Sequence, residues 1–194
     1  TFPVPRVLIV DFDVHHGNGT QDAFYRDSSV SFFSIHQSPY YPFSGYSREA
    51  GEALSQGTTI NVALPEGIGD SGYRAAFQEI LRPAAHRFQP DFILVSAGYD
   101  AHWLDPLAGM NVTVTGYGRM VRLLMELADE LCSGKLVLAL EGGYHLDVLS
   151  HAVLTSLRVL SGSDEGPSDP FGEYPGVERS ATDAIAQTRE VHRL

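Results

Sequence analysis

Five short apolar runs, separated by stretches with helical periodicity, constrain the fold of this chain more than any other feature. The runs are nearly continuous and rich in β-branched residues: Val7–Val10, Val30–Ile35, Thr59–Ala63, Phe92–Ser96 and Leu136–Leu140. Such runs are typical of parallel strands that are covered on both faces. Because strands alternate with helices, the pattern predicts right-handed crossovers and an α/β fold, a parallel sheet flanked by helices.

Apolar residues also repeat at helical spacing in three segments. These segments begin near Tyr73, Thr115 and Asp147. Asp70 or Ser71 is the expected N-cap of the first. The stretch 163–176 is rich in Gly, Pro, Ser and acidic residues, which is typical of a surface connection. For residues 180–194 we expect a last short helix, which packs against the rest of the domain through the face that carries Ile185.

Composition and charge narrow the class of function. The formal net charge of -11 argues against a phosphate-binding surface, so we expect no direct contact with nucleic acid. The apolar runs are too short to span a bilayer, and no charged-then-apolar leader is visible, so we expect no membrane partner. The single cysteine, Cys132, cannot form an internal disulfide and lies in a helical pattern, which predicts a buried thiol. A cytoplasmic setting is the expectation.

Polar residues of the kinds that bind metals follow three of the apolar runs. Binding sites in open α/β sheets form beyond the carboxyl ends of the strands. The segments at those ends are Asp11-Phe12-Asp13-Val14-His15-His16, Gly98-Tyr99-Asp100 and Glu141-Gly142-Gly143-Tyr144. Three strands therefore deliver ligand-type groups to the same edge of one sheet.

The first of these segments predicts a metal site. In extended backbone, Asp11, Asp13 and His15 fall on one side and His16 on the other. A carboxylate and an imidazole two residues apart can reach one ion, and Asp100 supplies a third ligand from a neighbouring strand. Three protein ligands leave a position for water and substrate, as in catalytic sites. Zinc is the leading candidate, and carboxylate-rich ligation keeps Fe(II) open. The structural alternative is that the aspartates only cap turns.

Tyr144 is a candidate hydrogen-bond donor. It follows Gly142 and Gly143, whose backbone can approach a ligand closely. A phenol at a strand end beside a metal can donate to a developing oxyanion. The structural alternative is a tyrosine that packs over a glycine turn. The remaining helical histidines are expected to be surface or satisfied groups: His86, His151 and His192.

These motifs resemble the histone deacetylase family. The segment Asp11–Thr20 is similar to the central signature of histone deacetylases and their bacterial relatives. The resemblance continues, in order, through Ser34–His36, Tyr41–Pro42, Asn61–Val62, Gly98–His102, Asp105–Leu107 and Glu141–Tyr144. It implies an arginase/deacetylase-type sheet in a partial catalytic domain spanning 1–194, with a core over 4–162 and a surface connection and C-terminal helix over 163–194.

The resemblance also implies roles for individual residues. Zinc would be held by Asp13, His15 and Asp100. Tyr144 would polarise the scissile carbonyl together with the metal. The tunnel for the acyl-lysine stem would be lined by Tyr41, Leu107, Gly142 and Gly143.

Potassium is a further implied cofactor, at two sites. The residues implied for the first site are Asp11, Asp13, His15, Ser34 and Ile35. The residues implied for the second, through their carbonyl groups, are Phe24, Asp27 and Val30.

One part of the family pattern is not present in this chain. The paired histidines that act as general base and acid lie before the first predicted strand, and the first strands of the family sheet are missing too. Asp11 is expected to orient one of those histidines, and His16 is expected to point away. The chain opens Thr1-Phe2-Pro3, almost directly before a site motif. We therefore expect a piece of a longer enzyme, weak or inactive alone, with Val7–Val10 exposed as a sheet edge.

Three hypotheses about function remain. The first is zinc-dependent hydrolysis of an acetylated amine, either acetyl-lysine or an acetylated polyamine or other small molecule. The second is an arginase-like ureohydrolase with two metal ions, but Asp100-Ala101-His102 lacks a second aspartate two residues on. The third is a non-catalytic module that binds a metal or an acyl-lysine, against which the intact Tyr144 argues.

Overall fold

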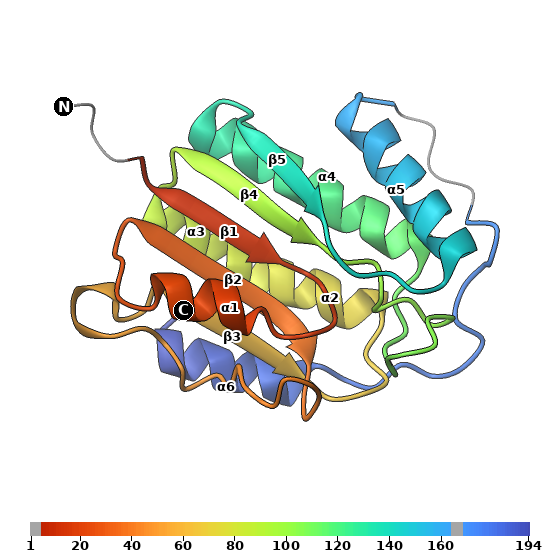
Figure 1. Ribbon diagram of the computed structural model, residues 1–194, viewed down its shortest axis with the longest axis horizontal. Helices are drawn as coiled ribbons and strands as arrows, with labels where there is room; N and C mark the ends of the chain where they lie inside the picture. Colours follow the sequence, from red (N-terminus) through yellow and green to blue (C-terminus); the bar gives the residue numbers. More distant parts are fainter. Residues whose placement is uncertain (1–4, 164–168) are drawn as a thin grey trace.

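The structure is a computed structural model that describes residues 5–163 and 169–194. Residues 1–4, and residues 164–168 of the predicted surface connection, lie outside the described residues. Five parallel strands form one sheet in the order β3-β2-β1-β4-β5, with helices packed around it (Figure 1). The strands are β1 (Val7–Asp11), β2 (Val30–Gln37), β3 (Thr59–Leu64), β4 (Phe92–Ala97) and β5 (Leu136–Leu140). All five predicted strands and the α/β fold class are confirmed.

Within residues 5–163 and 169–194, six α-helices connect or follow the strands. They are α1 (Asn18–Phe24), α2 (Asp70–Ala76), α3 (Arg82–Phe88), α4 (Val114–Cys132), α5 (Leu146–Leu160) and α6 (Thr182–His192). A π-helical turn, Phe77–Leu81, joins α2 to α3, and a 3₁₀ turn, Ala53–Ser55, precedes β3. The three predicted helical patterns and the last short helix are confirmed. In the described part of the chain, no helix is long and apolar enough to cross a membrane.

Helix α1 was not predicted, and the predicted cap of α2 is wrong. The seven residues of α1 bury only Gln21, so they carry no apolar stripe. At α2 the N-cap position belongs to Gly69, and Asp70 lies inside the first turn. The Asp70 carboxylate accepts hydrogen bonds from the N–H and the hydroxyl group of Thr113, at 2.9 and 2.8 Å. A tertiary contact that joins the starts of α2 and α4 has replaced the local cap.

The predicted exposed edge at Val7–Val10 is also wrong. Strand β1 lies at the centre of the sheet and pairs with β2 on one side and β4 on the other. One true edge, β3, is covered by α6, whose Thr188 hydroxyl donates to the carbonyl oxygen of Asn61 at 3.1 Å. The other edge, β5, is open in the described chain. Strand β1 is therefore paired on both sides within the described chain.

The two faces of the sheet are covered to different extents. Helices α2, α3 and α4 lie together on one face, where the main core forms, and α1 covers part of the other (Figure 1). On that second face Leu94 of β4 is 36% exposed and Val137 of β5 is 48% exposed. Coverage on both faces is therefore confirmed for the β1 side of the sheet and wrong for β4 and β5. Cys132 is buried, as predicted.

His192 at the end of α6 is buried rather than a surface or satisfied group. It is 5% exposed, and neither ring nitrogen has a hydrogen-bond partner among the described residues. Burial, followed by the nearby Arg87 charge, lowers the pKa of His192 to about 4. The folded protein therefore holds this imidazole neutral at a pH where the unfolded chain, with a histidine pKa of about 6.5, already binds a proton.

This pKa shift predicts acid sensitivity. Between about pH 6.5 and 4 the unfolded state binds the His192 proton and the folded state does not, so stability falls as pH falls. The contribution between about pH 7 and 5 is roughly 2 kcal/mol in the free energy of unfolding. Urea unfolding at both pH values should show a smaller loss for His192→Gln than for the unchanged protein. The exposed His151→Gln should behave like the unchanged protein, and equal losses in all three would contradict the prediction.

Candidate metal centre

The predicted site residues lie at the carboxyl ends of three neighbouring strands. Asp13 and His15 follow β1, Asp100 follows β4 and Tyr144 follows β5. A pocket of about 500 Å³ opens at this edge of the sheet. Its lining includes Asp11, Asp13, His15, His16, Glu141, Gly142 and Tyr144. Parallel strands with their crossovers bring these segments together although Asp13, Asp100 and Tyr144 are 44 to 131 residues apart in the sequence.

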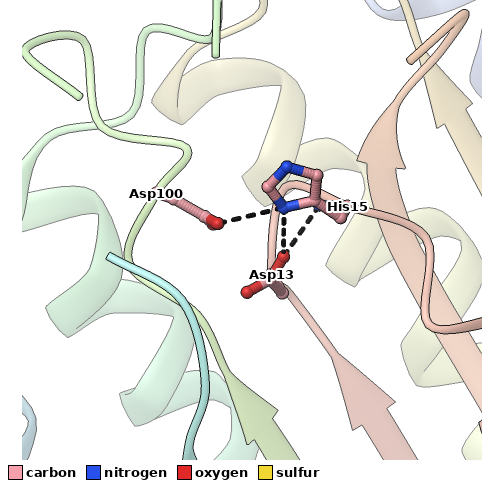
Figure 2. A group of neighbouring side chains, drawn as sticks. All are labelled: Asp13, His15 and Asp100. Carbon is pink, nitrogen blue, oxygen red and sulfur yellow. Dashed lines mark hydrogen bonds and ion pairs between the residues drawn. The ribbon is translucent and has the colours of Figure 1, made fainter. Parts of the chain in front are cut away.

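Asp13, His15 and Asp100 converge on one point (Figure 2). The Nδ1 atom of His15 lies 2.9 Å from Asp13 Oδ1 and 3.2 Å from Asp100 Oδ2. One ligand atom from each residue lies within 4.8 Å of the other two, and this is the only such group among the described residues. The spacing is short enough for all three to bind one ion after small side-chain rotations.

Backbone N–H groups hold both carboxylates in place. Asp13 Oδ2 accepts from the Gly142 N–H at 2.9 Å, and Asp13 Oδ1 accepts from the His15 N–H at 2.8 Å. Asp100 Oδ1 accepts from the Val14 N–H at 2.8 Å. These bonds cross-link the three strand ends. The other oxygen of Asp100, Oδ2, is buried and has no hydrogen bond. It lies 3.2 Å from His15 Nδ1, which is an ionic contact without hydrogen-bond geometry.

The backbone around the triad leaves room for the carboxylates only because two residues are glycine. A Cβ atom on Gly98 would lie 2.2 Å from Asp13 Oδ2, and one on Gly142 would lie 2.3 Å from Asp100 Oδ2. Real Cβ atoms do not approach an oxygen so closely. Two carboxylates, one imidazole and one unpaired buried oxygen therefore fit a divalent cation, and the donor set suits zinc or iron.

The pKa shifts report an excess of negative charge at the triad. The close contacts of its ring with the Asp100 and Asp13 carboxylates raise the pKa of His15 to about 10, so the ring is protonated. Burial opposes ionisation of Asp13, but hydrogen bonds from His15 and Gly142 outweigh it and lower the Asp13 pKa. Burial raises the pKa of Asp100. Two close carboxylates thus draw a positive charge to this point, and a metal cation would supply it in place of the proton.

Asp11 and His16 border the triad without joining it. The Asp11 carboxyl is buried, and burial together with the Asp13 charge raises its pKa well above the usual range. Its Oδ1 accepts from the Asp13 N–H at 3.1 Å. His16 is turned away: its Nδ1 lies 2.8 Å from Ser44 Oγ and its Nε2 lies 3.0 Å from Gln21 Oε1. His16 is therefore part of a buried polar network behind the site.

Tyr144 is placed by an aspartate whose role was not predicted. The Asp105 carboxylate accepts from the Tyr144 N–H at 2.8 Å and from the Leu107 N–H at 3.0 Å. Burial, then the Asp100 and Asp13 charges, raise the pKa of the Tyr144 phenol, so it stays protonated and able to donate. The available signal was Asp105 before a proline, where an aspartate accepts from the N–H two residues on.

The residues expected to line the tunnel form an open rim near His15. Tyr41 is 67% exposed, and its ring centroid lies 6.3 Å from that of His15 in an edge-on arrangement. Leu107 is 46% exposed. Tyr40 was missed: its ring lies 5.4 Å from the His15 ring, and its hydroxyl donates to the Leu107 carbonyl oxygen. The tandem Tyr40-Tyr41 was the available signal.

The predicted potassium sites have no direct support in the structure. Ser34 pairs with Asp11 in the sheet register, but its hydroxyl is hydrogen-bonded to His36 Nδ1 at 2.9 Å. At the second site, the carbonyl oxygens of Phe24 and Asp27 already accept from the N–H groups of Asp27 and Val30, at 3.0 and 3.3 Å. Both sites stay predictions.

Comparison with known proteins gives a consistent result. Residues 2–160 match the model of the "Histone deacetylase domain". The chain is 46% identical to "Histone deacetylase 14, chloroplastic" of Arabidopsis thaliana, with all of the chain aligned to 47% of the relative, and 42% identical to a "Probable deacetylase" of Archaeoglobus fulgidus over 82% of the chain and 45% of the relative.

Solved structures agree. The HD domain of HDA15 superposes with a TM-score of 0.84 and 37% identity, over 97% of this chain and 50% of that chain. The histone deacetylase Clr3 gives a TM-score of 0.84 and 36% identity, over 98% of this chain and 32% of that protein. The chain spans about half the length of the curated relatives it matches first. On this agreement of sequence, fold and site, the chain belongs to the histone deacetylase family.

Proposed function

We propose that the protein containing this chain is a zinc-dependent deacetylase that hydrolyses acetylated amines. The observation that carries the proposal is the Asp13, His15 and Asp100 triad, of which Asp13 and His15 line one pocket together with Tyr144. Zinc bound there would act as a Lewis acid on the amide carbonyl and would activate water for hydrolysis. Acetylated lysine is the leading substrate class, with acetylated polyamines or other acetylated small molecules as the alternative.

The residues of this chain would bind and polarise the substrate. The protonated Tyr144 phenol would donate a hydrogen bond to the carbonyl oxygen as negative charge develops on it. The Asp105 carboxylate would hold the Tyr144 and Leu107 backbones in one arrangement. The exposed ring of Tyr41 and the half-buried ring of Tyr40 would contact the aliphatic stem of an acyl-lysine at the rim.

Proton transfer is proposed to come from outside this chain. His15 belongs to the triad, and His16 is hydrogen-bonded away from it, so neither is free to act as base. Asp11, buried beside the pocket, would accept a hydrogen bond from a histidine of the remaining half of the family domain. Positioned acid–base groups contribute roughly 10²–10⁴-fold to rate, so residues 1–194 alone should turn over slowly.

The experiment compares metal states and substrates in one assay. The intact protein is stripped with a chelator, reconstituted with zinc or Fe(II), and given an acetyl-lysine peptide or an acetylpolyamine. Activity should disappear on stripping and return with metal. Activity on neither substrate with metal bound would favour the alternative, a non-catalytic module that binds a metal or an acyl-lysine. The purified 1–194 chain, assayed in parallel, tests whether proton transfer depends on a histidine outside this chain. Comparable turnover of the 1–194 chain and the intact protein would overturn that proposal.

Asp105→Asn should lower turnover through Tyr144. The substitution replaces an acceptor of two backbone N–H groups with an amide that repels one of them, and it removes a charge. A hydrogen bond to a charged group contributes about 1.5–3 kcal/mol, so we expect a loss on the order of tenfold in kcat or more.

A double-mutant cycle separates positioning from general destabilisation. In a Tyr144→Phe background, Asp105→Asn should have a much smaller effect on kcat, because there is no phenol left to position. Asp129→Asn, on the exposed side of α4, is the matched control and should change neither kcat nor the melting temperature. Equal losses of kcat in both backgrounds would show that Asp105 does not act through Tyr144.

Two further assignments are proposals without a structural test. We propose potassium as an accessory ion, for which a dependence of melting temperature on K⁺ rather than Na⁺ would be support. A cytoplasmic setting is proposed from the absence of cysteine pairs. Two relatives are named chloroplastic, so localisation of the intact protein by microscopy is the deciding measurement.

A further inference from the structure

A second cavity lies at the opposite ends of the strands from the metal triad. Its volume is about 570 Å³. Three residues that line it, Arg6, Ser31 and Thr58, lie within one residue of the first residues of β1, β2 and β3. The end of α3 and the last turn of α6 complete its wall. Because all strands are parallel, this amino edge is separated from the carboxyl edge by the length of the sheet, and the two sites can be occupied together.

The charge of this cavity is opposite to that of the whole chain. Acidic residues outnumber lysine and arginine 24 to 13 in the sequence. The cavity nevertheless has three arginines in its lining, Arg6, Arg87 and Arg193, and no carboxylate among the described residues that line it. A cavity lining with three guanidinium groups and no carboxylate is therefore a local exception to the acidic composition of the chain.

The three arginines keep donors free for a ligand. Arg87 uses Nη1 to donate to the His192 carbonyl oxygen at 2.8 Å, which leaves most of its five N–H groups. The Arg6 guanidinium lies 4.6 Å from the Phe88 ring centroid, so its face is packed while its edge stays available. Asp91 accepts only from the backbone N–H of Arg6. Neither Arg6 nor Arg193 forms a side-chain ion pair within the described chain.

Four arginines elsewhere in the structure form ion pairs with carboxylates. The ion pairs of the described residues include Arg26 with Glu52, Arg82 with Glu130, Arg119 with Asp70 and Arg189 with Glu79. Their guanidinium groups are neutralised within the fold. Arg6, Arg87 and Arg193 form no such pair among the described residues, and they are gathered around one cavity that has no carboxylate in its lining.

We propose that this cavity binds a small organic phosphate carrying at least two negative charges. The planar arginine fork matches phosphate oxygens in bidentate pairs, and three forks around one cavity suit a diphosphate or a doubly phosphorylated metabolite. The volume lies in the range of small-molecule sites. The Ser31 and Thr58 hydroxyl groups already donate to backbone carbonyls, so their oxygens are left to accept from ligand hydroxyl groups. The overall charge of -11 disfavours an extended nucleic acid.

Calorimetric titration of the intact protein with pyrophosphate, at constant ionic strength, tests the proposal. We expect saturable binding tighter than about 1 mM and a higher melting temperature with pyrophosphate present. Arg6→Gln and Arg193→Gln should each weaken binding on the order of tenfold, because each removes charge-assisted hydrogen bonds. Both side chains are exposed, so the folded state should survive.

The matched control is Arg122→Gln, which removes the same charge from the exposed face of α4, away from the cavity. It should bind pyrophosphate as the unchanged protein does. Arg6→Lys should bind with intermediate affinity, because it keeps the charge and loses the planar fork. Absence of saturable binding, or equal affinity in the cavity variants and Arg122→Gln, would overturn the proposal. The assay uses no acetylated substrate, so its result is independent of the proposed deacetylation.

Discussion

Asp13→Ala should abolish tight zinc binding and, with it, activity of the intact protein. Asp13 is a proposed ligand that is fixed by the N–H groups of His15 and Gly142, and its loss also removes an acceptor from the His15 ring. Changing the support of a ligand already costs about 10–100-fold in metal affinity, so removing the ligand should exceed 100-fold. Competition titration with a chromophoric zinc chelator measures the change directly.

Neighbouring histidines provide the sharpest control for this result. His15→Ala removes a ring that touches both carboxylates, whereas His16→Ala removes a ring that contacts Ser44 and Gln21. Zinc affinity should therefore fall far more for His15→Ala. His16→Ala should mainly lower the melting temperature, because it leaves buried polar partners unpaired. Equal losses of zinc affinity would show that the wrong histidine has been assigned to the metal.

The strands could be predicted from the sequence, but their order could not. The burial and the length of a strand are visible in its apolar run. The ends of all five predicted runs lie within two residues of the ends of the observed strands. Nothing in a run identifies both of its neighbours. Asp100 was expected on a strand next to the first one, yet β1 was expected at an edge of the sheet, whereas it lies between β2 and β4. The true open edge, β5, has Val137 and Leu140 48% and 60% exposed, and these apolar residues gave it the appearance of a buried strand.

The same division holds for the site. Asp13, His15, Asp100 and Tyr144 were found because metal-ligand and donor side chains follow strand ends, a pattern visible in one dimension. Asp105 acts on a backbone 39 residues away, and such a contact depends on loops that have no periodicity. Asp70 was predicted as a helix cap because the local pattern fits, yet a partner 43 residues away binds its carboxylate. Local sequence patterns therefore do not reveal which distant backbone or side-chain group a single polar side chain contacts.

Tyr144→Phe in the intact protein should lower kcat by roughly 10²–10³-fold, the usual loss for one oxyanion donor. The phenol lines the pocket beside the triad, and its raised pKa keeps it a donor at neutral pH. The substitution keeps the ring and removes only the hydroxyl group. KM should therefore change little, since the lost hydrogen bond strengthens only as negative charge develops on the carbonyl oxygen.

Zinc affinity distinguishes this variant from loss of the metal site. Tyr144→Phe should bind zinc as tightly as the unchanged protein, because the phenol is not one of the three proposed ligands. Tyr46→Phe removes the same hydroxyl group from an exposed ring that packs under Arg48, and it should leave both kcat and zinc affinity unchanged. An unaltered kcat in Tyr144→Phe would mean that Tyr144 only packs, and carbonyl polarisation would then have to come from the metal alone. A loss of kcat with full zinc occupancy is the result that assigns the donor role to the phenol.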